Sequence, residues 1–133
     1  MMPAMTAGAA APSGSVQVFV VKVSNKGMDL VYEPASLKAP VGSLVQFEFY
    51  PKNHTVSQAA FSNPCEPTNS IMPNVTGFFS GFMPTKPDAP MKPVFTIPIK
   101  DEKPIWYYCS QAKHCQSGMV GVINEYVPFI HAH

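Results

Sequence analysis

The sequence predicts an all-β protein, a Greek-key β-sandwich or barrel of about seven or eight strands. Three observations support this prediction. Short segments rich in β-branched and aromatic residues recur along the chain, and turn-forming residues separate them. Fifteen of the 133 residues are proline, which interrupts helices. No segment keeps a helical hydrophobic period beyond about one turn.

The first half of the chain contains three expected strands. Residues 16–23 are β-branched and apolar, and residues 28–34 form a shorter apolar stretch that ends at Pro34. In residues 45–50, side chains alternate between apolar and more polar ones, which is the period of a half-buried strand. This strand leads into a loop that contains His54.

Residues 57–93 are rich in proline, serine and asparagine, so we expect a long connection with little regular structure. Its apolar side chains are expected to pack this connection onto the barrel: Phe61, Ile71, Phe78, Phe79, Phe82 and Met83. Residues 94–99 predict a strand that Pro98 places at a sheet edge. Residues 104–109 and 119–127 predict the last two strands, with a nine-residue turn segment at 110–118.

Length and charge indicate a single domain without affinity for nucleic acid. A chain of 133 residues suggests one domain, which we place at residues 16–130, after a flexible leader at 1–15. The leader lacks the basic and apolar regions of an intact signal peptide. Nine lysines against eight acidic residues leave no basic patch. No apolar run is long enough to cross a membrane, and we expect a monomer.

Cys109, His114, Cys115 and Met119 lie close together, and three kinds of site compete to explain them. The first is a disulfide corner, but three cysteines can form only one intramolecular disulfide, which leaves one thiol unpaired. A nucleophilic cysteine–histidine pair is another, but it needs an orienting group and an oxyanion hole, usually at a helix N-terminus. The sequence predicts no such helix and no glycine-rich turn for a nucleophile, so we do not expect a hydrolase.

A metal site explains more of this pattern. Four residues separate Cys109 from His114, and four separate His114 from Met119. Thiolate, imidazole and thioether are soft or borderline ligands, and His54 would complete the set of two histidines, one cysteine and a weak axial methionine that binds blue copper. With Cys109 on copper, Cys65 and Cys115 remain to pair. These two cysteines are 50 residues apart, a loop whose closure stabilises by about 4 kcal/mol.

These residues carry a resemblance to a known family. The segment "NHTV" and the segment "PIWYYCSQAKHCQSGMVGVIN" resemble a cupredoxin of the phytocyanin type, and more narrowly the cupredoxin-like (plastocyanin-like) domains of fungal extracellular proteins. The adjacent pair His114-Cys115 is the most diagnostic detail. The resemblance implies a type 1 copper site with His54, Cys109 and His114 as strong ligands and Met119 as the axial one, a position at which many relatives carry glutamine.

The expected function is that of a secreted or cell-surface protein with one type 1 (blue) copper ion that carries single electrons. Its expected partner is an unidentified redox protein or another extracellular molecule. The alternatives are an extracellular binding or signalling domain, and a domain that sequesters, stores or delivers copper. Two sequons, at Asn53 and Asn74, are candidate glycosylation sites of a secreted protein.

Overall fold

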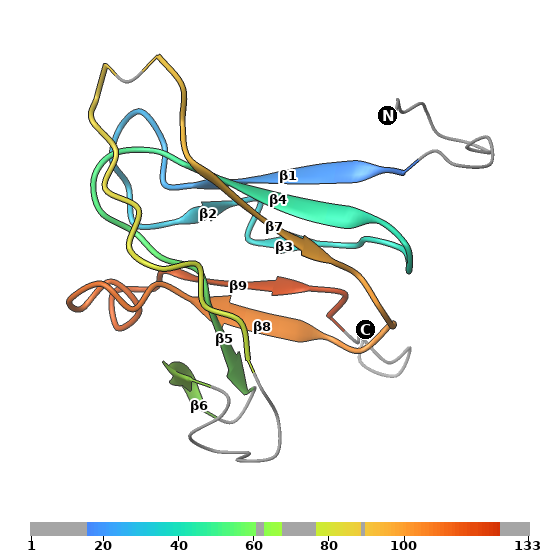
Figure 1. Cartoon of the computed structure of the whole chain (residues 1–133). Coiled ribbons are helices and arrows are strands. Elements are labelled where there is room, and N and C mark those ends of the chain that lie inside the picture. Colours follow the sequence, from blue (N-terminus) through green and yellow to red (C-terminus); the bar gives the residue numbers. More distant parts are fainter. Residues whose placement is uncertain (1–15, 61–62, 68–76, 89, 126–133) are drawn as a thin grey trace, which may run out of the picture.

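The computed structural model describes residues 16–60, 63–67, 77–88 and 90–125, and these form nine β-strands and no α-helix (Figure 1). The strands are β1 (Val18–Val23), β2 (Tyr32–Glu33), β3 (Ser36–Leu37), β4 (Leu44–Phe49), β5 (Ser57–Ala60), β6 (Asn63–Pro67), β7 (Val94–Pro98), β8 (Ile105–Tyr108) and β9 (Val120–Ile123). Among the described residues, therefore, no helix is long and apolar enough to span a membrane.

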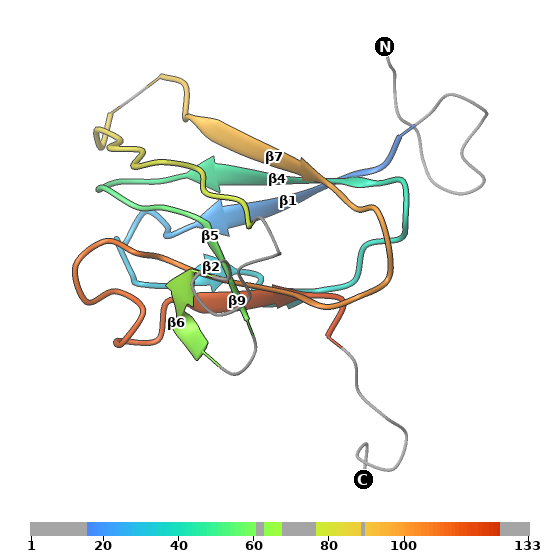
Figure 2. The same ribbon diagram turned by 60° about the horizontal axis from the view of Figure 1, so that its bottom comes forward.

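The strands form two sheets that pack face to face (Figure 2). One has four strands in the order β2-β1-β4-β7, and the other has five in the order β3-β9-β8-β5-β6. β1 and β4 pair in parallel, whereas β8 pairs antiparallel with both β5 and β9. The all-β sandwich predicted from the sequence is confirmed, with one or two more strands than expected within the described residues.

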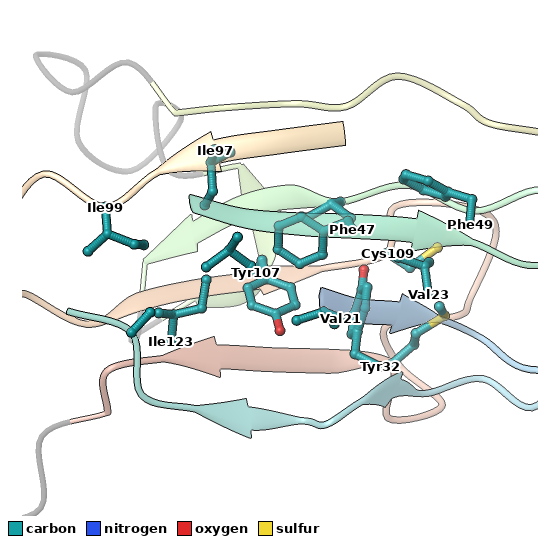
Figure 3. Packing of buried hydrophobic residues seen from close by; sticks show 14 residues of the cluster. Val21, Val23, Tyr32, Phe47, Phe49, Ile97, Ile99, Tyr107, Cys109 and Ile123 are labelled. Atoms are coloured by element: carbon teal, nitrogen blue, oxygen red, sulfur yellow. The ribbon is translucent and has the colours of Figure 1, made fainter. Parts of the chain in front are cut away.

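The core lies between the two sheets, and β4 shows how the sequence builds it. Val45, Phe47 and Phe49 are fully buried, while the residues between them are half-buried on the opposite face. This alternation confirms the predicted period of two. Figure 3 shows these side chains meeting others from the facing sheet. There the Tyr107 ring contacts two rings edge-on, with its centroid 4.8 Å from that of Tyr32 and 5.1 Å from that of Phe47.

Three short strands lie where the sequence predicts no strand. β5 and β6 fall within the supposed irregular connection 57–93, and β3 follows β2 closely. The residues of β5 and β6 are mostly serine, glutamine, alanine, asparagine and proline, which have low strand propensity. β5 forms because it pairs with the strongly β-prone β8, with Ala59 opposite Trp106. Tertiary pairing therefore overrides local propensity here.

Other strand predictions are confirmed with shorter bounds. The segment 28–34 contributes only β2, because Met28 has a left-handed backbone (φ 62°) that does not continue a strand. β7 is the edge strand that Pro98 predicts. β9 covers the start of the expected strand 119–127, whose last two residues lie outside the described part of the chain.

The apolar residues of the long connection divide into two groups. Phe78 and Met83 pack against the core as expected. For Phe79 and Phe82 the expectation was wrong, because they remain 54% and 52% exposed and contact each other edge-on, with ring centroids 6.0 Å apart. Phe61 and Ile71, like the leader 1–15, lie outside the described residues.

One end of the sandwich gathers four loop segments, at the left in Figures 1 and 2. β1, β4 and β8 end there, and β7 and β9 begin there. We call this end the site pole and define it as residues 24–31, 50–56, 79–93 (except residue 89, which is not described) and 109–119. All four predicted copper ligands lie within these segments.

Candidate metal centre

Three of the four predicted ligands meet at the site pole. The Sγ atom of Cys109 lies 3.3 Å from Nδ1 of His114 and 4.0 Å from Nδ1 of His54. The ligand atoms of these three residues all lie within 4.8 Å of one another, and the two imidazole centroids are 5.1 Å apart. A thiol and two ring nitrogens, one from each imidazole, therefore converge on one point.

His54 is held in place by the chain that precedes it. Its side chain is 2% exposed, and its Nε2 lies 3.2 Å from the Pro51 carbonyl oxygen and 3.1 Å from the Lys52 backbone nitrogen. The Lys52 N–H donates to Nε2 when the ring proton is on Nδ1; with Nδ1 bound to a metal, Nε2 would carry the proton and donate to the Pro51 carbonyl. Burial lowers the pKa of His54, an effect that the Pro51 contact opposes. The neutral imidazole is the form that binds metal.

His114 lies in the turn between β8 and β9. Its N–H donates to the Gln111 carbonyl at 3.0 Å, and its carbonyl accepts from the Met119 N–H at 3.0 Å. Gly118 has a φ of 105°, a backbone conformation that favours glycine and returns the chain toward β9. The half-buried His114 ring also has a pKa lowered by burial.

Thr55 and Ser110 link the two loops that carry His54 and Cys109. The Thr55 N–H donates to Cys109 Sγ at 3.4 Å. Its Oγ1 accepts from the Ser110 N–H at 2.8 Å, and the two hydroxyl oxygens are 2.9 Å apart. Neither residue is among the site residues predicted from the sequence, where their positions directly after His54 and Cys109 are the available signal.

Tyr32 of β2 supports the loop that contains His54 and Thr55. It is 2% exposed, and its hydroxyl donates to the Thr55 carbonyl at 2.7 Å. Burial raises the pKa of Tyr32 well above its usual value, and negative charge on Cys109 raises it further. The phenol therefore stays protonated and keeps its hydrogen bond. The sequence offers no signal for this role, because Tyr32 is one apolar position in a short strand.

Met119 joins the site through its backbone. Its carbonyl accepts from the Cys109 N–H at 3.1 Å, and its own N–H donates to the His114 carbonyl. Its side chain is fully buried in the core cluster that also contains Cys109. The backbone of Met119 thus ties two of the predicted ligands to each other, and its side chain lies in the apolar interior beneath them.

The predicted disulfide is present. Cys65 and Cys115 are bonded, with Cα atoms 5.8 Å apart, and Cys109 is the free, buried cysteine among the described residues. The bond joins β6 to the residue directly after His114. Cys115 is buried against Ala59 of β5 and Tyr108 of β8, so this part of the turn packs onto the five-stranded sheet.

A cavity of about 250 Å³ opens at the two imidazoles. Its lining consists of Met28, Leu30, Lys52, Asn53, His54, Gln111 and His114. The sequon residue Asn53 is half-buried there, and its side-chain oxygen is buried without a hydrogen-bond partner among the described residues. The other sequon residue, Asn74, lies outside the described part of the chain.

The donor set matches copper or another soft or borderline ion better than a hard cation. One thiolate and two imidazoles in a buried corner suit soft or borderline ions, and carboxylates, which hard cations prefer, are absent from the described cluster. Met119 is buried in the same core cluster as Cys109. The side chains of His54, Cys109 and His114 therefore fit a copper ion.

Comparison with curated proteins finds two fungal relatives, although the sequence matches no family profile. An extracellular serine-rich protein of Arthroderma benhamiae is 36% identical over 121 residues, covering 91% of this chain and 44% of the relative. A probable GPI-anchored cupredoxin-1 of the same fungus is 35% identical over 107 residues, covering 80% of this chain and 50% of the relative. The chain thus spans about half the length of these relatives.

Solved structures show the fold independently. A purple cupredoxin from Nitrosopumilus maritimus superposes with a TM-score of 0.58 at 19% identity, covering 79% of this chain and 96% of that one. Plastocyanin from Dryopteris crassirhizoma gives 0.51 at 15% identity, covering 78% and 96%. The fold is thus that of the cupredoxins, and with the two fungal relatives it shows that the chain is a fungal cupredoxin-like domain.

Proposed function

We propose that this domain holds one copper ion in a type 1 centre and carries single electrons. The observation that supports this most directly is the convergence of Cys109 Sγ with Nδ1 of His54 and Nδ1 of His114. We propose Met119, buried beside them, as the axial ligand. Copper in such a site supplies a one-electron couple between Cu(II) and Cu(I).

The surroundings of the site favour electron transfer because they restrict movement of the ligands. The Cys65–Cys115 bond and the Tyr32 hydrogen bond each tie a ligand-bearing loop to a sheet, and the Thr55–Ser110 contacts tie two of these loops to each other. Ligands that cannot move need little rearrangement when the charge of the bound ion changes. The proposed four-residue set also leaves no coordination position for a substrate, so we propose a carrier and not an enzyme.

The proposed location is outside the cell, either secreted or at the cell surface. The two relatives are named as an extracellular protein and a GPI-anchored protein. A structural disulfide also forms and persists mainly in oxidising compartments. We propose that the domain is a monomer that exchanges electrons with a redox protein.

The visible spectrum after addition of Cu(II) tests this proposal. We expect an intense copper–thiolate absorption that makes the protein blue, because the thiolate of Cys109 would bind the ion directly. Cys109→Ser should abolish the colour, whereas Ser117→Ala, an exposed position in the same turn, should keep it. Voltammetry of the blue form should show reversible one-electron reduction.

A colourless Cu(II) complex, or full colour in Cys109→Ser, would exclude a type 1 site and favour a binding or signalling domain. A blue protein that is not reversibly reduced would favour copper sequestration, storage or delivery over electron transfer.

A further inference from the structure

Charge is distributed unevenly between the two ends of the molecule. All nine lysines and eight acidic residues lie in the described part of the chain. The site pole holds five lysines and two acids, a net charge of +3, and the remainder holds four lysines and six acids, a net charge of −2. The charges of the site pole are Lys26, Lys52, Lys86, Lys92, Lys113, Asp29 and Asp88.

Contacts place several of these lysines around the metal site. Lys52 lines the cavity together with both histidines, and Lys113 directly precedes His114. The Thr85 N–H donates to the Lys52 carbonyl at 2.8 Å, so the backbone of the next residue, Lys86, lies close to the loop of Lys52. The Lys92 ammonium lies 4.7 Å from the centre of the Tyr50 ring, just before the loop of His54. Lys52 therefore lines the cavity and Lys113 adjoins it in sequence, while Asp29, between the lining residues Met28 and Leu30, adds one negative charge nearby.

Lys22 does not add to this charge, although it also lies near the Tyr50 ring. In the sheet it stands opposite Glu33 on β2 and Glu48 on β4. Two acidic residues thus stand opposite Lys22 in the sheet register, and the excess of positive charge lies in the loops.

An exposed aromatic pair lies beside the same site. The Met83 N–H donates to the His54 carbonyl at 3.0 Å, which holds the segment 79–83 against the His54 loop. Phe79 and Phe82 in this segment are about half exposed and contact each other. Met28, which is 44% exposed, lines the cavity itself. The loops that carry these apolar residues and the lysines lie at the same end of the molecule (Figure 1).

We propose that the site pole docks onto an acidic surface of a partner protein, with carboxylates facing the lysines and apolar side chains covering Phe79 and Phe82. This inference rests on the proposed function, because an electron carrier needs a partner close to the metal. Charge complementarity speeds and orients the encounter. The aromatic pair favours a protein over an anionic polysaccharide, since only a protein offers apolar side chains to cover it.

Peptide binding tests the docking surface without copper. Two fluorescent peptides of equal negative charge serve as probes: one of glutamate and glycine, and one of glutamate and leucine. Measured by fluorescence anisotropy with the purified chain, both should bind, with affinities that fall as salt rises, and the leucine peptide should bind more tightly. Lys52→Gln with Lys113→Gln should weaken both peptides by about threefold or more.

Two controls separate the site pole from overall charge. Lys100→Gln with Lys103→Gln removes the same charge from the opposite end and should leave both affinities unchanged. Phe82→Ser should remove the advantage of the leucine peptide while the glutamate–glycine peptide binds as before. Thermal unfolding of each variant confirms that it is folded.

Three results would overturn the proposal. They are no binding of either peptide, equal weakening by both lysine pairs, and binding of an alginate oligomer of equal charge as tightly as the leucine peptide. The last result would identify an anionic polysaccharide as the better partner. Because no electron is transferred in this assay, its failure is distinct from a failure of the blue-copper proposal, which the Cu(II) spectrum decides.

Discussion

The sulfur of Cys109 is fully buried, yet its neighbours are polar on two sides. The Thr55 N–H donates to it. The Nδ1 atoms of His54 and His114 lie close enough to the sulfur for all three atoms to bind one metal ion. A buried thiol surrounded only by hydrocarbon is inert. Here the N–H stabilises negative charge on the sulfur, which is the form a metal binds. The structure thus distinguishes Cys109 from a structural core cysteine.

Replacing the proposed axial residue tests its role. Met119→Gln places a harder amide oxygen where the thioether lies, which favours Cu(II) over Cu(I). We expect the reduction potential to fall while the copper–thiolate absorption remains, measured by voltammetry and visible spectroscopy. Met91→Gln, at a position 84% exposed and away from the core, is the control and should change neither. An unchanged potential in Met119→Gln would show that the thioether is not a ligand.

The ligand residues could be predicted from the sequence, but their supports could not. Cysteine, histidine and methionine are chemically distinctive, so their spacing alone suggests a metal site. The contributions of Thr55 and Tyr32 depend on a backbone N–H and a hydroxyl meeting partners that are far apart in the sequence. Threonine and tyrosine occur in most strands for reasons of packing, so their presence carries no such information.

At the level of elements, β6 is held to the sandwich largely by its disulfide. It lies at a sheet edge, and its pairing with β5 is interrupted by an irregularity between Ala59 and Ala60. Two prolines within β6 remove backbone donors from the ladder. The bond from Cys65 to Cys115 therefore adds to the irregular pairing of β6 with β5, and it connects β6 to the turn beside His114.

Removing that bond should destabilise the domain. For the Cys65→Ser, Cys115→Ser double variant we expect a loss of about 4 kcal/mol in the free energy of unfolding, as expected for a crosslink between residues 50 apart. Denaturant titration of the metal-free protein measures this loss. In the unfolded, non-reduced parent chain, one thiol should react with a labelling reagent, and peptide mapping should place it at Cys109. A reactive Cys65 would contradict the pairing.

The strands with strong local signals could be predicted, and the weak ones could not. β4 alternates clearly and was placed almost to the residue, whereas β5 consists of Ser57, Gln58, Ala59 and Ala60, a segment that fits a loop equally well. Its strand conformation comes from its pairing with β8, a partner almost 50 residues further along the chain. Such a pairing has no local signature.

In the molecule as a whole, the residues of the core and the residues of the candidate site lie in different places. The core lies between the sheets, and the ligand loops extend from one end, so substitutions in the loops need not disturb the packing. The fold class was predictable because β-prone segments and turn residues alternate along the entire chain. The uneven distribution of charge between the ends was not, because lysines distant in sequence meet only in the folded protein.

The edges of the two sheets lead to a prediction about solubility. Pro98→Val would create an uninterrupted segment of β-prone residues from Val94 to Ile99 on an edge strand. We expect this variant to aggregate faster on prolonged incubation, because such a segment can pair with the same segment of another molecule. Thioflavin fluorescence and light scattering measure the rate, with Pro87→Val in an exposed loop as the control. Equal aggregation of both variants would argue against edge protection.

Each described sheet edge is unsuited to recruiting another strand. β2 and β3 are two residues long, and β6 and β7 contain proline. A second chain therefore finds no continuous row of backbone donors and acceptors to extend. A molecule that associates with the described part of this domain must instead recognise side chains, and the loops of the site pole carry several exposed ones. The prolines that interrupt the edge strands thereby leave recognition to side chains and not to backbone pairing.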